Sequence, residues 1–245
     1  MRVLQINTTC GNGSTGRAAA ILSERLESSG HSAYVAYGYY DSNLKNSIKL
    51  LESKSRRKVQ CELLKTRITG YHGFTNSKAS IKLINLIKEI KPDVIHLRNI
   101  HSGYLNIEVL FNFLKDANIP IVWTLHDCWS FTGHCAYFSS VGCEKWKTGC
   151  NNCPNLKSYP KSWFFDRSEE QWLIKKELFT KIPNITLVTP SKWLYNLVED
   201  SYLSHYYRVV IANAIDVEKF RIIDDLEIRE KYNIIDKKIV LAVAN

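Results

Sequence analysis

Short apolar runs alternate along the chain with longer stretches in which apolar residues recur every three or four positions. The short runs predict buried β-strands, and the periodic stretches predict helices that each bury one face. The expected strands are residues 3–6, 33–37, 94–97, 119–125, 185–189 and 208–211. The expected helices are residues 17–29, 77–90, 106–117, 168–181 and a short one that Ser191 caps.

Alternation of this kind predicts an α/β fold: a Rossmann-like, doubly wound parallel sheet with helices on both faces, spanning residues 1–210. Residues 127–160 interrupt the alternation and form a cysteine-rich loop insertion. Residues 211–236 are typical of an interdomain linker with a short helix at 225–232. The apolar run at 237–245 predicts the first strand of a further domain that is missing or truncated in this chain.

Composition fits a folded protein with a sizeable core, since 45% of residues are hydrophobic and 11% are aromatic. The chain shows neither a signal peptide nor an apolar run long enough to span a membrane, so we expect a cytoplasmic protein, at most attached peripherally to the inner face of the plasma membrane. Most of the net charge of +9 is local: residues 45–91 hold twelve Lys or Arg against three Glu, with a dense run at 54–58. Such a patch could bind nucleic acid, an anionic membrane or a phosphorylated substrate, or be a solvated helix face.

A glycine-rich loop, GNGSTG at residues 11–16, separates the first strand from the first helix. Glycine allows close approach of the backbone to a ligand, and the helix N-terminus that follows favours an anion. The alternative is a tight β–α turn in which Arg17 pairs with a surface carboxylate. The predicted phosphate-binding residues are Gly13, Ser14, Thr15, Gly16 and Arg17.

Polar side chains follow two other predicted strands. His126 and Asp127 come directly after the strand at 119–125. Open α/β sheets bind ligands at the carboxyl ends of their strands, so this pair is a candidate for catalysis. The strand at 94–97 leads to a second polar group that could line the same cleft, with Arg98 suited to binding a phosphate or carboxylate. Alternatively, His96 packs within its strand and Asn99 makes a turn. The second group is His96, Arg98, Asn99 and His101.

The chain has seven cysteines and no secretion signal, so a disulfide framework is not favoured. Four of them, Cys135, Cys143, Cys150 and Cys153, have a spacing that predicts a structural zinc site. His134 or Cys128 could replace one ligand, and reduced thiols or disulfides remain alternatives. Because four thiolates leave no open coordination position, no catalytic metal is expected.

Motifs along nearly the whole chain resemble the N-terminal, acceptor-side half of retaining family 4 glycosyltransferases of the GT-B fold, in the branch for capsule, exopolysaccharide and colanic-acid-type biosynthesis. Arg98 stands where that family often has a histidine, Ala214 replaces a usual glycine, and the nucleotide-sugar domain is absent. The motifs are GSTGR (13–17), PDVIH (92–96), WTLHD (123–127), FTGHC (131–135), PSKW (190–193) and IANAID (211–216).

The resemblance implies that the glycine loop approaches the diphosphate of a UDP- or GDP-linked sugar held by a second domain. It implies that His126 contacts the transferred sugar and that Asp127 orients His126 or binds an acceptor hydroxyl. The acceptor would be a growing surface polysaccharide or a lipid-linked saccharide, and the polar group after the strand at 94–97 would bind it: His96, Arg98, Asn99 and His101. This chain alone would be inactive. Trp163, Phe164 and Phe165 could stack on sugars, touch lipid or pack within their loop.

Two other functions remain open. One is a basic module, stabilised by structural zinc, that binds nucleic acid or an anionic membrane without catalysis. The other is a regulatory subunit. Nucleic acid is the less favoured partner, because the positive charge lies apart from the cysteines. The sequence also contains no helix-turn-helix and no aromatic strand platform.

Overall fold

A computed structural model describes residues 1–51, 56–218, 220–222 and 225–242, without the side chains of residues 56–59 and 62. The basic run at 54–58 therefore lies outside the described side chains. The chain divides into two compact units, Met1–Asn213 and Ala214–Asn245. The first unit contains the predicted α/β fold, and all candidate site residues belong to it.

One parallel sheet of seven strands forms the centre of the first unit, in the order β3-β2-β1-β4-β5-β6-β7. The predicted fold class is confirmed. The strands are β1 (Arg2–Thr9), β2 (Ser32–Tyr39), β3 (Ser47–Lys49), β4 (Val94–Leu97), β5 (Ile121–Thr124), β6 (Ile185–Thr189) and β7 (Tyr207–Val210).

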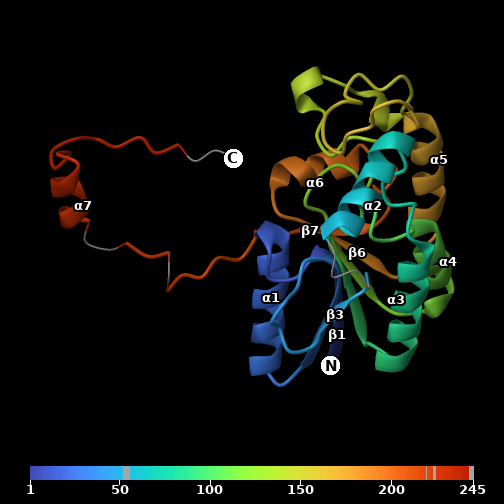
Figure 1. Ribbon diagram of the computed structural model, residues 1–245, viewed down its shortest axis with the longest axis horizontal. Helices are drawn as coiled ribbons and strands as arrows, with labels where there is room; N and C mark the ends of the chain where they lie inside the picture. The colour runs from blue at the N-terminus through green and yellow to red at the C-terminus, as the bar shows by residue number, and fades with distance from the viewer. Residues whose placement is uncertain (52–55, 219, 223–224, 243–245) are drawn as a thin grey trace. The chain divides into compact units, whose positions relative to one another are not determined.

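Helices cover both faces of this sheet. Figure 1 shows α1 on one side and α3, α4 and α5 packed side by side on the other. The cysteine-rich loop contains only two short 3-10 turns, Ser139–Val141 and Lys145–Lys147. The helices are α1 (Gly13–Ser28), α2 (Arg56–Thr69), α3 (Ser77–Ile90), α4 (Ile107–Ala117), α5 (Ser168–Phe179) and α6 (Lys192–Glu199).

Helix α3 illustrates how local sequence sets these boundaries. The Asn76 side chain accepts a hydrogen bond from Ala79 N at 3.3 Å, which caps the start, and Lys91 ends the helix in the left-handed conformation. Both ends agree with the prediction. The spacing of Ile81, Ile84, Leu86 and Ile87 predicts the apolar face of this helix, and the prediction is partly wrong, because Ile81 is 52% exposed. Ile87 is buried as predicted, together with Leu83 one turn before it, and Ile81 points roughly 200° away from Leu83 around the helix.

Two elements of the first unit lack a clear sequence signal. Strand β3 is only three residues long and lies at the edge of the sheet, without an apolar run. Helix α2 has no strong apolar stripe. Helix α1 begins at Gly13, a full turn earlier than predicted, so the glycine-rich motif forms its first turn.

The second unit contains one short helix, α7 (Leu226–Lys231), within the predicted range 225–232. Residues 237–242 form no strand. A strand needs a neighbour for its ladder hydrogen bonds, and the described part of this unit offers none. The prediction that this run opens a further domain stays a prediction. No helix among the described residues is long and apolar enough to cross a membrane.

Candidate functional site

Three predicted groups of site residues lie at one edge of the sheet. Strands β1, β4 and β5 are adjacent and parallel, so their carboxyl ends meet at the same edge. The strand order reverses between β1 and β4, which is the point where open α/β sheets bind ligands. The glycine turn follows β1, residues 98–101 follow β4, and His126 and Asp127 follow β5. In Figure 1 the cysteine-rich loop covers the edge opposite the N-terminus.

The glycine turn is shaped by backbone that other residues rarely adopt. Gly11 and Gly13 have φ angles of +75° and +68°. A Cβ on Gly16 would lie 2.4 Å from Thr9 Oγ1, so the first turn of α1 packs directly against β1. Asn12 provides no side-chain cap to α1, which leaves the first-turn amides available to an anion. Ser14 and Thr15 lie in this turn.

A surface hollow of about 610 Å³ lies beside the turn. Its lining comes from the loops after β1 and β2 and from helix α1, and it is polar. Arg17 is exposed one residue beyond Gly16. Gly11 and Asn12 of the turn line the hollow, and the predicted phosphate-binding residues 13–17 do not. The hollow is lined by Cys10, Gly11, Asn12, Ala20, Glu24, Asp41, Ser42, Asn43, Leu44 and Lys45.

At the end of β4, His96 is part of the packed strand. Its Nε2 and Thr124 Oγ1 are hydrogen-bonded at 2.8 Å, and the residue is 9% exposed. Burial, together with the charge of Arg98, lowers the pKa of His96 to about 3, so the ring is neutral at neutral pH. This position agrees with the alternative that His96 packs within its strand.

Arg98 is also buried, and Gln5 on β1 orients it. Arg98 Nε donates to Gln5 Oε1 at 3.2 Å, and Gln5 Nε2 donates to the backbone of α1 at Ala19 O, 2.9 Å away. Burial lowers the pKa of Arg98 only to about 10, so the guanidinium stays protonated. A fixed positive charge therefore lies between the glycine turn and the end of β5.

His126 has a ring nitrogen without a partner. Its Nε2 is buried and forms no hydrogen bond with the described part of the chain. Burial first, and Arg98 second, lower the pKa of His126 to about 4, so the imidazole is neutral at neutral pH. A buried polar atom left unsatisfied is costly, and it marks a position where a ligand or water can bind. The cavity beside His126 measures only about 10 Å³, enough for one water rather than a sugar ring.

Asp127 pairs with His101 rather than with His126. His101 Nε2 donates to Asp127 Oδ2 at 3.0 Å, and Trp129 N donates to Oδ1 at 2.9 Å. Burial opposes the charge, yet these donors hold the pKa of Asp127 below its usual value. Asn99 packs against β1, since its N donates to Asn7 Oδ1 at 3.2 Å. The site is thus a hydrogen-bonded network across β1, β4 and β5.

Sequence patterns missed three residues of this network: Gln5, Trp129 and Lys175. Lys175 on α5 is fully buried; its Nζ donates to Trp129 O at 2.8 Å and lies 4.0 Å from the centre of the Trp129 ring. Burial lowers its pKa to about 7. A polar residue inside the apolar run at 3–6 could have pointed to Gln5. Nothing in the helical pattern of residues 168–181 distinguishes Lys175 from its exposed neighbour Lys176.

The cysteine-rich loop packs over α5. Gly133 N donates to Cys150 Sγ at 3.1 Å, and the interaction between Cys135 and Cys153 raises the pKa of the Cys135 thiol and lowers that of Cys153. His134, the predicted substitute ligand, bonds instead to Leu156 O at 3.2 Å, and Cys128 is buried with its pKa raised by burial. Within the described residues, no group of three or more His, Cys, Asp or Glu is arranged to hold a metal ion. The zinc site stays a prediction.

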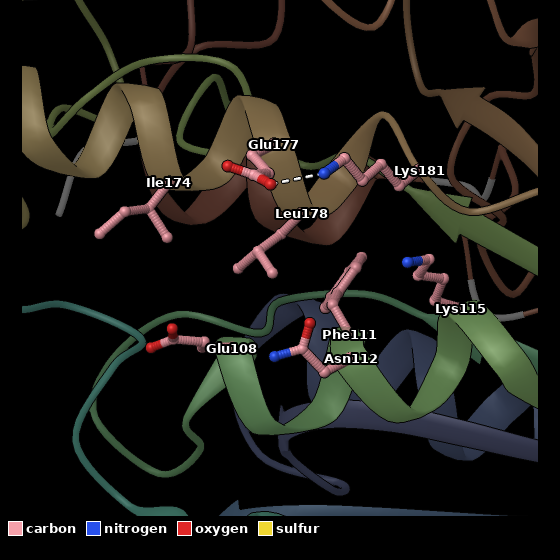
Figure 2. Close-up of a pocket in the computed structure, with 8 residues that line it drawn as sticks. All are labelled: Glu108, Phe111, Asn112, Lys115, Ile174, Glu177, Leu178 and Lys181. Carbon is pink, nitrogen blue, oxygen red and sulfur yellow. Dashed lines mark hydrogen bonds and ion pairs between the residues drawn. The ribbon is translucent and has the colours of Figure 1, made fainter.

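A second groove, of about 320 Å³, runs between α4 and α5 in the helical layer (Figure 2). Leu178 lies opposite Phe111 across it, Ile174 lies on the side of Glu108, and Glu177 pairs with Lys181 at 2.5 Å on its rim. Its lining comes from these two helices and not from the loops at the carboxyl edge of the sheet, so we assign the candidate site to that edge.

Comparison with known proteins identifies the family of this chain. The sequence profile of glycosyltransferase family 4 matches residues 15–219, a range that begins within the first turn of α1 and includes the ends of β4 and β5. The chain belongs to glycosyltransferase family 4. It is 28% identical over 238 residues to WcaC of Escherichia coli strain K12, a protein named as a colanic acid biosynthesis glycosyl transferase. That alignment covers 92% of this chain and 57% of WcaC.

Among solved structures, this family 4 chain is similar to sucrose-phosphate synthase from Thermosynechococcus elongatus, with a TM-score of 0.57 and 12% identity. The match covers 95% of this chain and 52% of that protein, and at this identity it shows the fold alone. The chain thus spans about half the length of these relatives.

Proposed function

We propose that the chain forms the acceptor-side half of a retaining, nucleotide-sugar-dependent glycosyltransferase for a colanic-acid-type surface polysaccharide. One observation carries the proposal: the glycine turn, Arg98 and His126 converge on the carboxyl edge of one parallel sheet in a family 4 chain. The similarity to WcaC supports the polysaccharide class. Because the hollow beside His126 holds only a water, a second domain would supply the opposite wall and the nucleotide site.

In this proposal, each group acts by position and charge. The first-turn amides of α1 and the protonated Arg98 stabilise the donor diphosphate as negative charge develops on it. The free Nε2 of His126 binds a hydroxyl of the transferred sugar. Transfer is a front-side displacement in which the leaving phosphate takes the acceptor proton, so no strong base is required. Asp127 and His101 hold the turn after β5 in place.

Transfer of radiolabelled sugar tests the proposal. A set of UDP- and GDP-linked sugars is offered with a glycolipid extract as acceptor. We expect no transfer above background by this chain alone, and transfer once residues 1–213 are fused to the part of WcaC that the chain does not cover. In the fused protein, His126→Ala should lower the rate at least about tenfold, the equivalent of ~1.4 kcal/mol of transition-state stabilisation.

His205→Ala is the matched control, because His205 is exposed and lies between α6 and β7. Ordinary enzymatic rates from the chain alone would contradict the proposal that a second domain supplies the opposite wall of the cleft. A fused protein that transfers no sugar, or one that is unaffected by His126→Ala, would count against the assignment.

We propose an anionic membrane surface as a further partner, near a lipid-linked acceptor. Trp163, Phe164 and Phe165 are 46%, 70% and 50% exposed. They lie beside the end of α2, because Trp163 N donates to Arg67 O at 2.8 Å. Arg67 and Lys161 are exposed in the same region. Aromatic side chains flanked by positive charge suit the interface of an anionic bilayer.

Vesicle sedimentation measures this binding. The chain should sediment with vesicles that contain phosphatidylglycerol and not with neutral phosphatidylcholine vesicles. Phe164→Ser should weaken binding roughly tenfold, since burying one aromatic side chain contributes about 1.5 kcal/mol or more. Tyr207→Ser, at a residue that is 72% exposed on β7, is the control. Equal binding to both vesicle types would rule out the membrane contact.

A further inference from the structure

One exposed tyrosine of the cysteine-rich loop is fixed by hydrogen bonds to the candidate site. Tyr159 is 54% exposed, yet its hydroxyl oxygen lies 3.3 Å from Ser102 Oγ and 3.5 Å from His101 Nδ1. The Tyr159 and His101 rings are in edge contact, with their centroids 5.9 Å apart. The glycosyl transfer proposed above assigns no role to the Tyr159 ring.

The hydrogen bonds run in one direction, from the phenol of Tyr159 to a buried carboxylate. His101 Nε2 donates to Asp127 Oδ2 at 3.0 Å, so the other ring nitrogen, Nδ1, is the one that accepts. Ser102 Oγ lies 2.8 Å from Nδ1 and donates to it, and the Tyr159 hydroxyl donates to Ser102 Oγ. The phenol oxygen therefore keeps its lone pairs for a donor from outside the protein, such as a sugar hydroxyl.

The backbone on both sides of this contact is fixed as well. Ser102 has a φ of +80°, a conformation that serine rarely adopts, and Tyr39 donates its hydroxyl hydrogen to Ser102 O. The backbone of Tyr159 is tied to the turn after β5, because Ala136 N donates to Tyr159 O at 3.3 Å and Cys128 N donates to Ala136 O at 2.9 Å. A ring that is already held in this way loses little side-chain entropy when a ligand contacts it.

Tyr159 lies next to the position where the transferred sugar is expected. His101, which contacts the Tyr159 ring, lines the small cavity together with His126 and Asp127. The unpartnered Nε2 of His126 is the atom to which we assign a hydroxyl of the transferred sugar. A ring bound on Tyr159 would therefore be a neighbour of that sugar, which is the position that an acceptor occupies.

Exposure alone does not distinguish Tyr159 from other tyrosines. Tyr207 is 72% exposed, and its hydroxyl has no hydrogen-bond partner among the described residues. It is the first residue of β7, so it lies at the amino edge of the sheet, away from the candidate site. Tyr159 combines exposure with an anchored hydroxyl at the carboxyl edge.

We propose that Tyr159 binds a pyranose ring of the saccharide acceptor, which stacks on the exposed part of the aromatic ring and donates a hydroxyl hydrogen to the phenol oxygen. The choice of a saccharide rests on the proposed function. The C–H bonds on one face of a pyranose form an apolar surface that an aromatic ring can remove from water. The hydroxyls around the rim of the sugar need polar partners, and the phenol oxygen of Tyr159 is one.

Saturation-transfer NMR measures binding to the full chain, with oligosaccharides from partially hydrolysed colanic acid as the probe. We expect the C–H protons on one face of a pyranose to receive the most saturation. Tyr159→Ala should raise the dissociation constant about tenfold, because the stacked area returns to water. Tyr159→Phe keeps the ring and loses the phenol oxygen, so it should raise the constant only roughly threefold. Tyr207→Ala is the matched control and should bind as the unmodified chain does.

Hydroxyl-radical footprinting locates the bound saccharide without any substitution. The radicals oxidise exposed aromatic rings, and the oxidised peptides are mapped by mass spectrometry. The same oligosaccharides should protect Tyr159 and leave the oxidation of Tyr207 unchanged. This result is read on the unmodified chain, so the inference remains testable even if Tyr159→Ala folds poorly.

Two results would overturn the inference. One is equal oxidation of Tyr159 with and without the saccharide, and the other is the same dissociation constant for Tyr159→Ala and the unmodified chain. Sugar transfer by the fused protein that depends on His126 but not on Tyr159 would reject this subsite and retain the transferase. Saccharide bound on Tyr159, without any transfer by the fused protein, would retain the subsite and reject the transferase.

Discussion

Lowering the pH from 7 to 5 is expected to reduce the free energy of unfolding of the unit Met1–Asn213 by several kcal/mol. The cause is three buried histidines, His72, His96 and His134, and the half-buried His126. Burial lowers the pKa of His72 and His96 to about 3, and that of His126 and His134 to about 4. In the unfolded chain the same rings titrate near the usual histidine value of about 6.5.

The sign of the effect follows from proton binding. Between pH ~6.5 and ~4 the unfolded chain binds protons that the folded chain does not, so stability is complete above this range and falls as the pH drops through it. Each histidine contributes up to ~1.4 kcal/mol per pH unit. The contributions are not additive, because the His72 and His134 rings are 5.8 Å apart and repel when charged. Asp127 and Asp166 have lowered pKa values and stay charged throughout this window.

Urea unfolding at pH 7, 6 and 5 measures this dependence. His134→Gln removes one titrating ring but keeps a donor for Leu156 O. The slope of the free energy of unfolding against pH should therefore fall by up to ~1.4 kcal/mol per pH unit, the contribution of one proton. His205→Gln, at an exposed position, is the matched control. The same unfolding midpoint at pH 7 and pH 5 would contradict the prediction.

Local signals in the sequence were sufficient to predict the parallel sheet and the positions where its strands end. Apolar runs and caps depend on neighbouring residues, so β4, β6 and the start of α6 at Ser191 were predictable. The shared edge then followed, because parallel strands place all their carboxyl ends on one side. This is why the glycine turn, Arg98 and His126 could be grouped before their contacts were known.

Partners within the site depend on tertiary packing and could not be predicted in the same way. Asp127 is adjacent to His126 in sequence, yet its carboxylate bonds to His101, which follows another strand. Lys175 on α5 bonds to Trp129, although the cysteine-rich loop separates the two residues in the sequence. Ile81 matched a helical pattern but lies on the exposed side of α3. Sequence spacing gives the strand or helix that carries a side chain, and the packing of the layers decides what that side chain contacts.

Replacing Gly133 with alanine is expected to destabilise the first unit by about 3 kcal/mol or more. A Cβ at this position would lie 2.0 Å from Ser168 O and 2.7 Å from Cys150 Cβ. The closest atom is backbone at the first residue of α5, so the clash cannot be relieved by rotating a side chain. Movement of Gly133 would also strain its hydrogen bond to Cys150 Sγ. Calorimetry should show a melting temperature lower by roughly 10 °C.

Gly142→Ala separates this steric effect from the general cost of replacing a glycine. A Cβ on Gly142 would meet no described atom within 4 Å, and the residue has a φ of +58°. Alanine there costs only the left-handed backbone strain of about 1 kcal/mol. The melting temperature should fall by roughly 3 °C. The φ of Gly133 lies outside the left-handed region, and its requirement for glycine comes from the close approach of the loop to α5. Equal melting temperatures for the two variants would show that the loop does not pack on α5 as tightly as these contacts require. A large loss at Gly133 alone would establish that the cysteine-rich loop is an integral part of the core beside the candidate site.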